Sequence, residues 1–454
     1  MLILTGIKQM VKSLLSTFQE IRKNNLTLYL NHLLVVYTFL IPISERGKSA
    51  VFFTILLLCL VRGNFKKYFK IAIQNKIVQA MFFFFLIHII WIYGTDNMKD
   101  AKNIIDDMKY LLFPLLFLSF LDKRFFISIL NAFILGMFCS EVISYLIHFN
   151  ILPYELILYG KEIYKTPAIN NPSPFLDHAR YGILLSLAIG FLLYNFLYLK
   201  ISSVYVKSII LIFLITASFN LSLIGGRIGY ISFIVIISFL ILRKFKDNLF
   251  KSVVVLCITL SVILSVFYQS SDLFQQRVDK SLHSIVEISE NNNFKSSIGQ
   301  RIGIWIYSMN VAKDNLFFGV GTGDQLDAVK QLINVEHDFL KNLSHLHNEY
   351  FKNIVQFGII GFLFYLNIFY QIFKFSAENK YKKDILIIVT LVMLTATLTS
   401  IFGSNIYLPL FVTIVAATIS TTATIEDKFS RLNIKTLLIY ILLVFSSLII
   451  AFLQ

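Results

Sequence analysis

The sequence predicts an all-α, polytopic membrane protein, and three observations carry this prediction. The chain of 454 residues is 57% hydrophobic and only 15% charged, and its mean hydropathy of +0.72 is far above that of a soluble domain. Many apolar windows reach about 18–22 residues, the length that an α-helix needs to cross a bilayer. These runs are continuous and lack the period-2 alternation of a transmembrane β-barrel, so we expect helices.

The apolar windows predict about twelve transmembrane helices, or thirteen if the last window also crosses the membrane. The windows are residues 26–44, 49–61, 77–94, 110–121, 125–149, 179–199, 208–224, 228–242, 252–268, 350–373, 385–402, 405–420 and 436–453. Cys59, Cys139 and Cys257 all fall inside them. We therefore expect neither an extracytoplasmic disulfide framework nor a cysteine-based metal site.

The distribution of lysine and arginine explains the net charge of +15 and sets the orientation. With the N-terminus in the cytoplasm, the inner segments hold most of the basic residues and the short outer loops hold few, as the positive-inside rule requires. No nucleic-acid partner is needed to explain the charge. Residues 1–25 combine apolar residues at helical spacing with basic residues, and they lack the apolar core of a cleavable signal. We expect an amphipathic segment on the cytoplasmic leaflet.

This orientation divides the chain into four parts and places the polar ones on the outer side. Residues 1–25 are the N-terminal segment, 26–268 carry helices one to nine, 269–349 form one large outer loop, and 350–454 hold the C-terminal transmembrane helices. The large loop is expected to contain short helices, one around Arg301 and one over residues 326–333, because apolar residues recur there at helical spacing. A second outer loop, 150–178, contains four prolines and should be irregular.

Arg227 is the first candidate for a functional charge. It follows Gly225 and Gly226 in a very short outer turn between two apolar runs. An arginine at a membrane boundary either extends to lipid headgroups or faces a cavity or a partner. The paired glycines indicate a shaped turn and favour the second role.

Other outer residues are less distinctive when each is considered alone. Arg301 is an ordinary loop arginine, and Arg277 follows an apolar run that it could simply anchor. His178 and Arg180 open the run 179–199, where they fit a cavity wall and an interfacial belt equally well.

His347 stands directly before the apolar run 350–373, and histidine is the usual general base near neutral pH. A zinc site with His345 and nearby acidic residues is not expected, because His-Glu-x-x-His is missing and His345 and His347 cannot share one helical face. Gly358 and Gly361 lie about three turns further on, so we expect them near the same helical face as His347. Small residues there would allow close helix packing.

Four of these residues resemble the motif of the O-antigen ligase family. In that motif a histidine is followed by Asn, Ser or Gln, nine residues, and Gly-x-x-Gly, and His347, Asn348, Gly358 and Gly361 match every defined position.

The resemblance extends to three upstream features. Arg227 resembles the family's arginine in a short outer turn, and Arg301 resembles its arginine early in the large loop. The stretch around Gly319-Val320-Gly321 is similar to the family's Pro-x-x-Gly-x-Gly. It differs at Leu316, where proline is usual, just as Gly226 stands where the family often has serine.

The resemblance implies an inverting, metal-independent glycosyltransferase of lipopolysaccharide biosynthesis in the bacterial inner membrane, with its site facing the periplasm. It would move a glycan from undecaprenyl pyrophosphate to lipid A-core oligosaccharide and would need no cofactor. Arg227 and Arg301 would hold and neutralise the diphosphate, since guanidinium groups bind phosphate oxygens bidentately. His347 would act as the base, with Arg277, Asn348, His178 and Arg180 as further substrate-binding residues. Gly358 and Gly361 would serve helix packing.

Two other functions stay open. An O-antigen polymerase would use the same lipid-linked donor but would extend the donor chain. A transporter of lipid-linked glycans belongs to another class, and it is disfavoured because transporters place charged groups near the middle of the bilayer. Here the middle of each predicted span is nearly free of charge.

Overall fold

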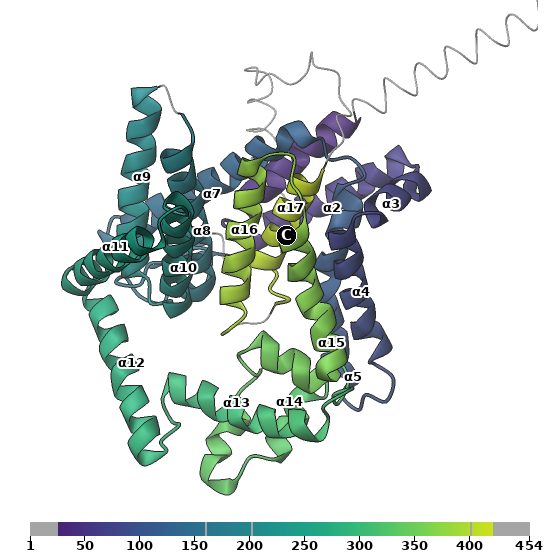
Figure 1. Ribbon diagram of the computed structural model, residues 1–454, viewed down its shortest axis with the longest axis vertical. Coiled ribbons are helices and arrows are strands. Elements are labelled where there is room, and N and C mark those ends of the chain that lie inside the picture. Colours follow the sequence, from purple (N-terminus) through teal and green to yellow (C-terminus); the bar gives the residue numbers. More distant parts are fainter. Residues whose placement is uncertain (1–25, 159–160, 201–202, 400–401, 421–454) are drawn as a thin grey trace, which may run out of the picture.

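The computed structural model describes residues 26–420 apart from 159–160, 201–202 and 400–401, and the chain is nearly all helical (Figure 1). The first helix spans Leu26–Leu40. The amphipathic segment expected over 1–25 and the span expected over 436–453 lie outside the described residues. The remaining helices and strands are α2 (Glu45–Arg62), α3 (Phe65–Ile73), α4 (Lys76–Ile90), α5 (Met98–Met108), η1 (Lys109–Leu112), α6 (Phe113–Phe117), η2 (Lys123–Phe125), α7 (Phe126–His148), β1 (Glu155–Leu158), β2 (Lys161–Lys165), α8 (His178–Tyr198), α9 (Val204–Leu223), α10 (Arg227–Lys244), α11 (Leu249–Ser270), α12 (Asp272–Asn291), α13 (Ser297–Asp314), α14 (Gln325–Gln331), η3 (Val335–Asn342), α15 (Glu349–Lys374), α16 (Lys380–Ala396) and α17 (Tyr407–Ile419).

Within the described residues, five helices are long and apolar enough to cross a membrane, which fits a polytopic membrane protein. They are Lys123–His148, His178–Tyr198, Val204–Leu223, Leu249–Ser270 and Glu349–Lys374. A sixth arises if α2 and Lys66–Ile73, which bend by 117°, form one broken span. The expected count of twelve or thirteen is therefore not confirmed. Several apolar windows correspond to shorter helices, such as Lys76–Ile90 and Tyr407–Ile419.

One predicted span, 110–121, differs from the structure. Helical backbone begins at Met98 and continues through α5, η1 and α6 to Phe117. Its first half is polar, with Asp100 in the first turn, so an apolar window could not detect it. Pro114 lies at the start of the short α6. The window thus marks only the apolar end of a longer, mixed segment.

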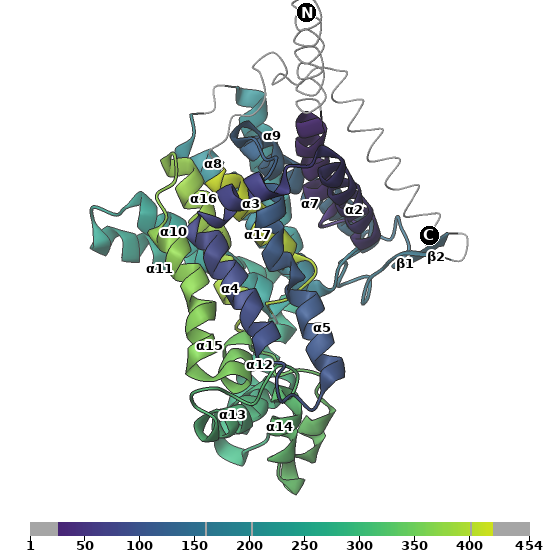
Figure 2. The same ribbon diagram turned by 90° about the vertical axis from the view of Figure 1, so that its right-hand side faces the viewer.

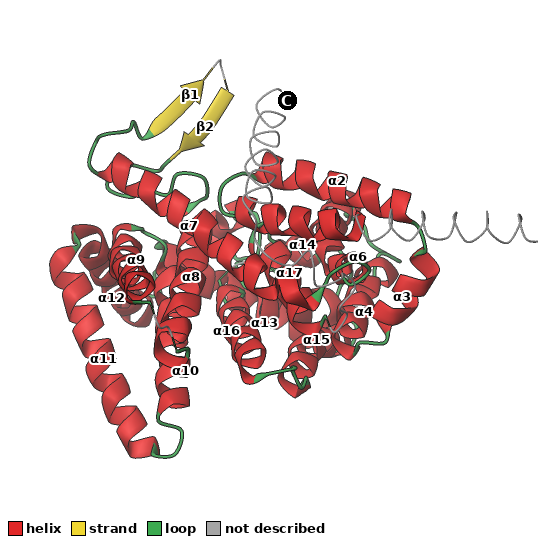
Figure 3. Cartoon of the chain, turned by 90° about the horizontal axis from the view of Figure 1, so that it is seen from above, coloured by secondary structure: helices red, strands yellow, loops and turns green. Residues whose placement is uncertain are grey.

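The loop 150–178 contains the antiparallel pair β1 and β2, at the rim of the molecule in Figure 3. Glu155 pairs with Lys165 and Leu156 with Tyr164, and the register shifts between Leu156 and Ile157. The fold is therefore nearly but not purely α-helical.

Close packing between α8 and α10 centres on two glycines. A Cβ on Gly229 would lie 2.8 Å from the backbone of Gly182, so neither position has room for a side chain. Ser186 Oγ donates to the carbonyl of Gly229 at 2.8 Å. Helix α16 packs against both of these helices. The turn at Gly225 and Gly226 directly precedes α10.

The segment between α11 and α15 folds as helices α12, α13 and α14 with η3, which lie together at one end of the molecule (Figures 1 and 2). The helices expected around Arg301 and over 326–333 are confirmed as α13 and α14. Helix α12 was not predicted. Its apolar residues Phe274 and Val278 lie one turn apart and pack in the hydrophobic core of the helix bundle. This helical spacing could have indicated α12.

Helix α15 is interrupted at Gly358, which has φ 63° and ψ −164°. The loop after α13 lies against this break: Val320 and Gly321 donate to the carbonyls of Val355 and Gln356 at 2.9 and 3.0 Å, and Ile359 donates to Leu316 at 2.8 Å. A Cβ on Gly358 would lie 2.3 Å from the backbone of Phe317. The expected single face running from His347 to Gly361 is wrong, because His347 precedes the helix and Gly358 breaks it.

Candidate functional site

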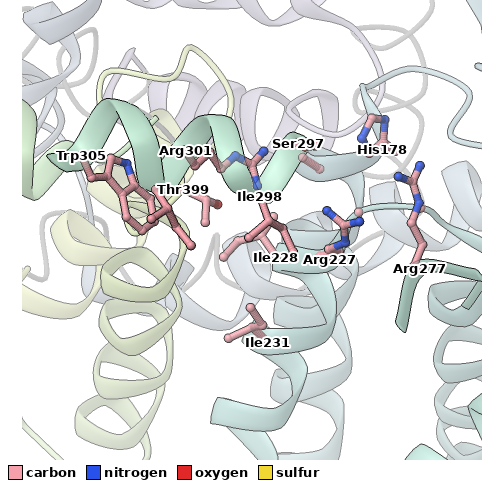
Figure 4. A pocket seen from close by; sticks show the side chains of 14 residues that line it. His178, Arg227, Ile228, Ile231, Arg277, Ser297, Ile298, Arg301, Trp305 and Thr399 are labelled. Atoms are coloured by element: carbon pink, nitrogen blue, oxygen red, sulfur yellow. The ribbon is translucent and has the colours of Figure 1, made fainter. Parts of the chain in front are cut away.

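A cavity of about 300 Å³ lies where α8, α10, α12, α13 and the segment after α16 meet (Figure 4). Its lining joins residues that are far apart in the sequence: His178, Ala179, Gly225, Gly226, Arg227, Ile228, Ile231, Arg277, Ser297, Ile298, Arg301, Ile302, Trp305 and Thr399. Four of the predicted site residues, namely Arg227, Arg277, Arg301 and His178, are thereby brought together.

The turn before Arg227 is shaped by its neighbours. Asn171 Oδ1 accepts from the backbone N–H of Gly225 at 2.9 Å. A Cβ on Gly225 would lie 2.8 Å from Nη2 of Arg277, and a Cβ on Gly226 would lie 2.4 Å from the carbonyl oxygen of His178. Gly225 therefore leaves room for a guanidinium, and Gly226 leaves room for the start of α8.

The three arginines come from three different helices, α10, α12 and α13, and face one space (Figure 4). Among the described residues, no aspartate or glutamate lines the cavity, and no ion pair involves any of these arginines. Nε of Arg227 is buried without a hydrogen-bond partner. Burial, followed by the charges of Arg277 and Arg301, lowers the pKa of Arg227. The cavity is therefore strongly cationic.

Three helix N-termini add to this positive potential. The first residues of α8, α10 and α13, which are His178, Arg227 and Ser297, all line the cavity. Asp177 and Ser296 cap α8 and α13 with their side chains, whereas the N-cap of α10 is Gly226, which offers no side-chain acceptor. The N-terminus of a helix attracts anions through its dipole and its free N–H groups. Helix α10 therefore has no side-chain cap beside Arg227.

Arg180, predicted with His178, lies outside the cavity lining. Its guanidinium pairs with Asp177 at 3.0 Å and with Glu45 at 3.7 Å. The structure gives Arg180 a role in joining α8 to α2, and its expected substrate contact stays a prediction.

Trp305 connects the cavity to the histidine motif. It lines the cavity, and its indole Nε1 donates to the carbonyl of Leu346, directly before His347, at 3.0 Å. Its ring stacks on Phe351 with 5.7 Å between centroids and 24° between planes. Because Phe351 lies in the first turn of α15, Trp305 ties α13 to the start of that helix.

His347 lies beside the cavity rather than in its lining. Its φ of 53° is left-handed, and its backbone N–H donates to Nδ1 of His345 at 3.1 Å. The two imidazoles lie 3.7 Å apart between centroids. Burial, the charge of His345 and the charge of Arg301 lower the pKa of His347 to about 4. The ring is therefore neutral at physiological pH.

Asn348 and Glu349 fix the start of α15. Asn348 Oδ1 accepts from the N–H groups of Tyr350 and Phe351 at 2.8 and 3.1 Å, so its side chain serves as the helix N-cap. The buried Glu349 accepts from the N–H of Phe402 at 2.8 Å. The substrate contact expected of Asn348 stays a prediction, and the structure assigns its oxygen to the helix.

Three residues near the site were missed in the sequence. Trp305 was treated only as an apolar residue of a helix, and Thr399 falls in a predicted span. His345 was considered only as a metal ligand, and the structure instead makes it the acceptor for His347. A tryptophan four residues after Arg301 would stand on the same helical face, and this spacing could have indicated Trp305.

Comparison with known proteins finds two similarities. Residues 212–366 match the model of a family described as O-antigen ligase. The matched segment contains Arg227, Arg277, Arg301, Trp305 and His347. The chain is also similar to an uncharacterized protein of Haemophilus influenzae, at 24% identity over 386 residues, which cover 81% of this chain and 91% of that relative.

Proposed function

We propose that the chain is an O-antigen ligase, and the match of residues 212–366 to the O-antigen ligase family supports this proposal. It would transfer a polysaccharide from undecaprenyl pyrophosphate to lipid A-core oligosaccharide at the periplasmic face of the inner membrane. The observation that carries the proposal is the cationic cavity, where Arg227, Arg277 and Arg301 converge with three helix N-termini and no carboxylate lines the described wall.

The diphosphate of the donor is the ligand that this cavity suits. Guanidinium groups bind phosphate oxygens bidentately and stay charged at any physiological pH. Negative charge grows on the diphosphate as its bond to the anomeric carbon breaks, so fixed positive groups stabilise the transition state more than the ground state. Arg227 and Arg301 would hold the two phosphates, and Arg277, against Gly225, would complete the set.

His347 would accept the proton of the attacking hydroxyl. A hydroxyl of the acceptor sugar attacks the anomeric carbon, the bond from that carbon to the diphosphate oxygen breaks, and the electron pair leaves with undecaprenyl pyrophosphate. The hydroxyl proton passes to the neutral imidazole of His347. A single displacement inverts the anomeric centre. The positive charge then created on His347 lies near Arg301, which favours prompt release of the proton.

Envelope glycolipids of a gene deletion test the assignment against the polymerase. A ligase defect leaves lipid A-core uncapped while full-length polymer accumulates on the lipid carrier. A polymerase defect instead leaves lipid A-core bearing single repeat units, and that outcome would overturn the proposal.

A reconstituted assay tests the chemistry. The purified protein in nanodiscs should transfer glycan from undecaprenyl pyrophosphate to lipid A-core in the presence of chelator. His347→Ala should abolish transfer while the protein remains folded in the membrane. Chelator-sensitive activity that a divalent metal restores would contradict the metal-independent mechanism.

A further inference from the structure

The cavity has two chemically different ends. Arg227, Arg277 and His178 lie at one end, and Trp305 and Thr399 lie at the other (Figure 4). Arg301 and the apolar side chains of Ile228 and Ile298 lie between them. A diphosphate satisfies the first end only. The second end offers an aromatic ring and a hydroxyl, which suit a ligand with an apolar face and polar edges.

The orientation of Trp305 is fixed before any ligand arrives. The bond from its Nε1 to Leu346 and its stacking on Phe351 hold the indole from two sides. The side chain is only partly buried, so ring surface remains at the cavity. A ring held in one rotamer loses little conformational entropy when a ligand stacks on it.

We propose that Trp305 and Thr399 form the subsite for the terminal sugar ring of the acceptor. The inference rests on the proposed ligase function. A pyranose has a C–H face that packs on an aromatic ring, while its hydroxyls remain at the edge for hydrogen bonds, one of them with Thr399 Oγ1.

The position of Trp305 favours the acceptor over the donor sugar. The donor is anchored by its diphosphate at the arginine end, whereas the acceptor hydroxyl must reach His347. Trp305 is hydrogen-bonded to the residue that precedes His347, so a sugar on the indole lies on the side of the base. The cavity would then hold, in order, diphosphate, anomeric carbon and acceptor sugar.

Steady-state kinetics on nanodisc-embedded protein test the subsite, with purified lipid A-core and undecaprenyl-pyrophosphate-linked glycan varied in turn. Trp305→Leu should raise the KM for lipid A-core about tenfold, which corresponds to about 1.4 kcal/mol. The KM for the donor should stay near its wild-type value. Trp305→Phe keeps an aromatic face and should recover most of the acceptor affinity.

The chain contains one matched control. Trp91 is the other of its 2 tryptophans, and its Nε1 also donates to a backbone carbonyl, that of Phe318, at 2.6 Å. Trp91 does not line the cavity. Trp91→Leu should therefore leave the KM for lipid A-core unchanged. Its largest expected effect is a lower amount of folded protein. An equal rise in both leucine variants would overturn the subsite.

Fluorescence gives a measurement that does not depend on transfer. In Trp91→Phe protein, Trp305 is the sole tryptophan. Core oligosaccharide freed of its lipid should change its emission in a saturable manner without donor, and should do so equally in a His347→Ala background.

The outcomes separate the two proposals. No saturable change, or a raised donor KM with an unchanged acceptor KM, would refute the acceptor subsite even if Arg227 and His347 variants are inactive as expected. Transfer that survives in His347→Ala would instead refute the catalytic assignment, while the fluorescence titration would still decide the role of Trp305.

Discussion

Gly225→Ala should weaken donor binding while leaving the fold nearly intact. The added Cβ would lie 2.8 Å from Nη2 and 3.2 Å from Nε of Arg277. Ordinary carbon contacts begin at about 3.5 Å, so the guanidinium must withdraw by roughly 0.7 Å or more. The atoms displaced are the far end of a flexible side chain, and we expect the cost to stability to be below about 1 kcal/mol.

The substitution should therefore weaken donor binding rather than folding. A hydrogen bond between charged groups contributes about 1.5–3 kcal/mol, so a displaced Arg277 should raise the donor KM by roughly 10- to 150-fold. Gly226→Ala provides the contrast. Its Cβ would meet the backbone carbonyl of His178 at 2.4 Å, and backbone cannot swing away, so this variant should lose roughly 2 kcal/mol or more of stability.

A double-mutant cycle decides whether Gly225 acts through Arg277. Donor KM is measured in nanodiscs for Gly225→Ala, Arg277→Ala and the double variant, and thermal unfolding is followed in parallel. If Gly225 affects the donor KM only by positioning Arg277, then Gly225→Ala should hardly change the donor KM of the Arg277→Ala protein. Additive effects, or an unchanged donor KM in Gly225→Ala protein that unfolds at the wild-type temperature, would refute the reasoning.

Three further variants and conditions test the site. Arg227→Lys should lower kcat/KM by roughly 10- to 100-fold, because an ammonium cannot reproduce the guanidinium fork; wild-type turnover at equal protein level would favour a lipid anchor. The active form of His347 is the neutral one and its pKa lies at about 4, so kcat/KM for the donor should be flat above about pH 5 and fall as the ring is protonated below that. An inflection near about pH 6.5, the ordinary value for histidine, would contradict the described surroundings of the ring. Gly358→Ala should destabilise the protein by roughly 2 kcal/mol or more in thermal unfolding, since it combines a left-handed backbone with a clash against Phe317; an unchanged unfolding temperature would show that the helix break is adaptable.

Residues that line the cavity were easier to single out from the sequence than the number and extent of the helices. Arg227 stood out because two glycines and two apolar runs surround it, and the structure explains both glycines by close contacts. Arg277 and Arg301 had no local signal of that kind. Their meeting with Arg227 depends on how α12 and α13 return to α10, which is a tertiary event that local spacing does not encode.

Helix count and helix continuity were the weaker predictions for a related reason. An apolar window measures composition, so it detected the end of the segment that starts at Met98 and missed its polar first half. Gly358 was assigned to packing because a glycine in an apolar run is compatible with a helix. The interruption is favourable because the loop 316–321 forms hydrogen bonds with the backbone on both sides of Gly358.

The electrostatics of the cavity connect these observations. Three uncompensated guanidinium groups and the positive ends of three helices repel one another, and a fold gains nothing by collecting them. Elsewhere in the described chain, Arg243 pairs with Asp384 at 3.0 Å and Arg124 with Asp122 at 2.8 Å. The partly buried Arg62 has no carboxylate partner, but it is a single charge that donates to the carbonyl of Ser119 at 2.6 Å and lies over the ring of Tyr68. At the cavity, by contrast, three guanidinium groups without a carboxylate partner converge. That contrast is the physical reason to assign this cavity, rather than any other charged cluster, to an anionic substrate.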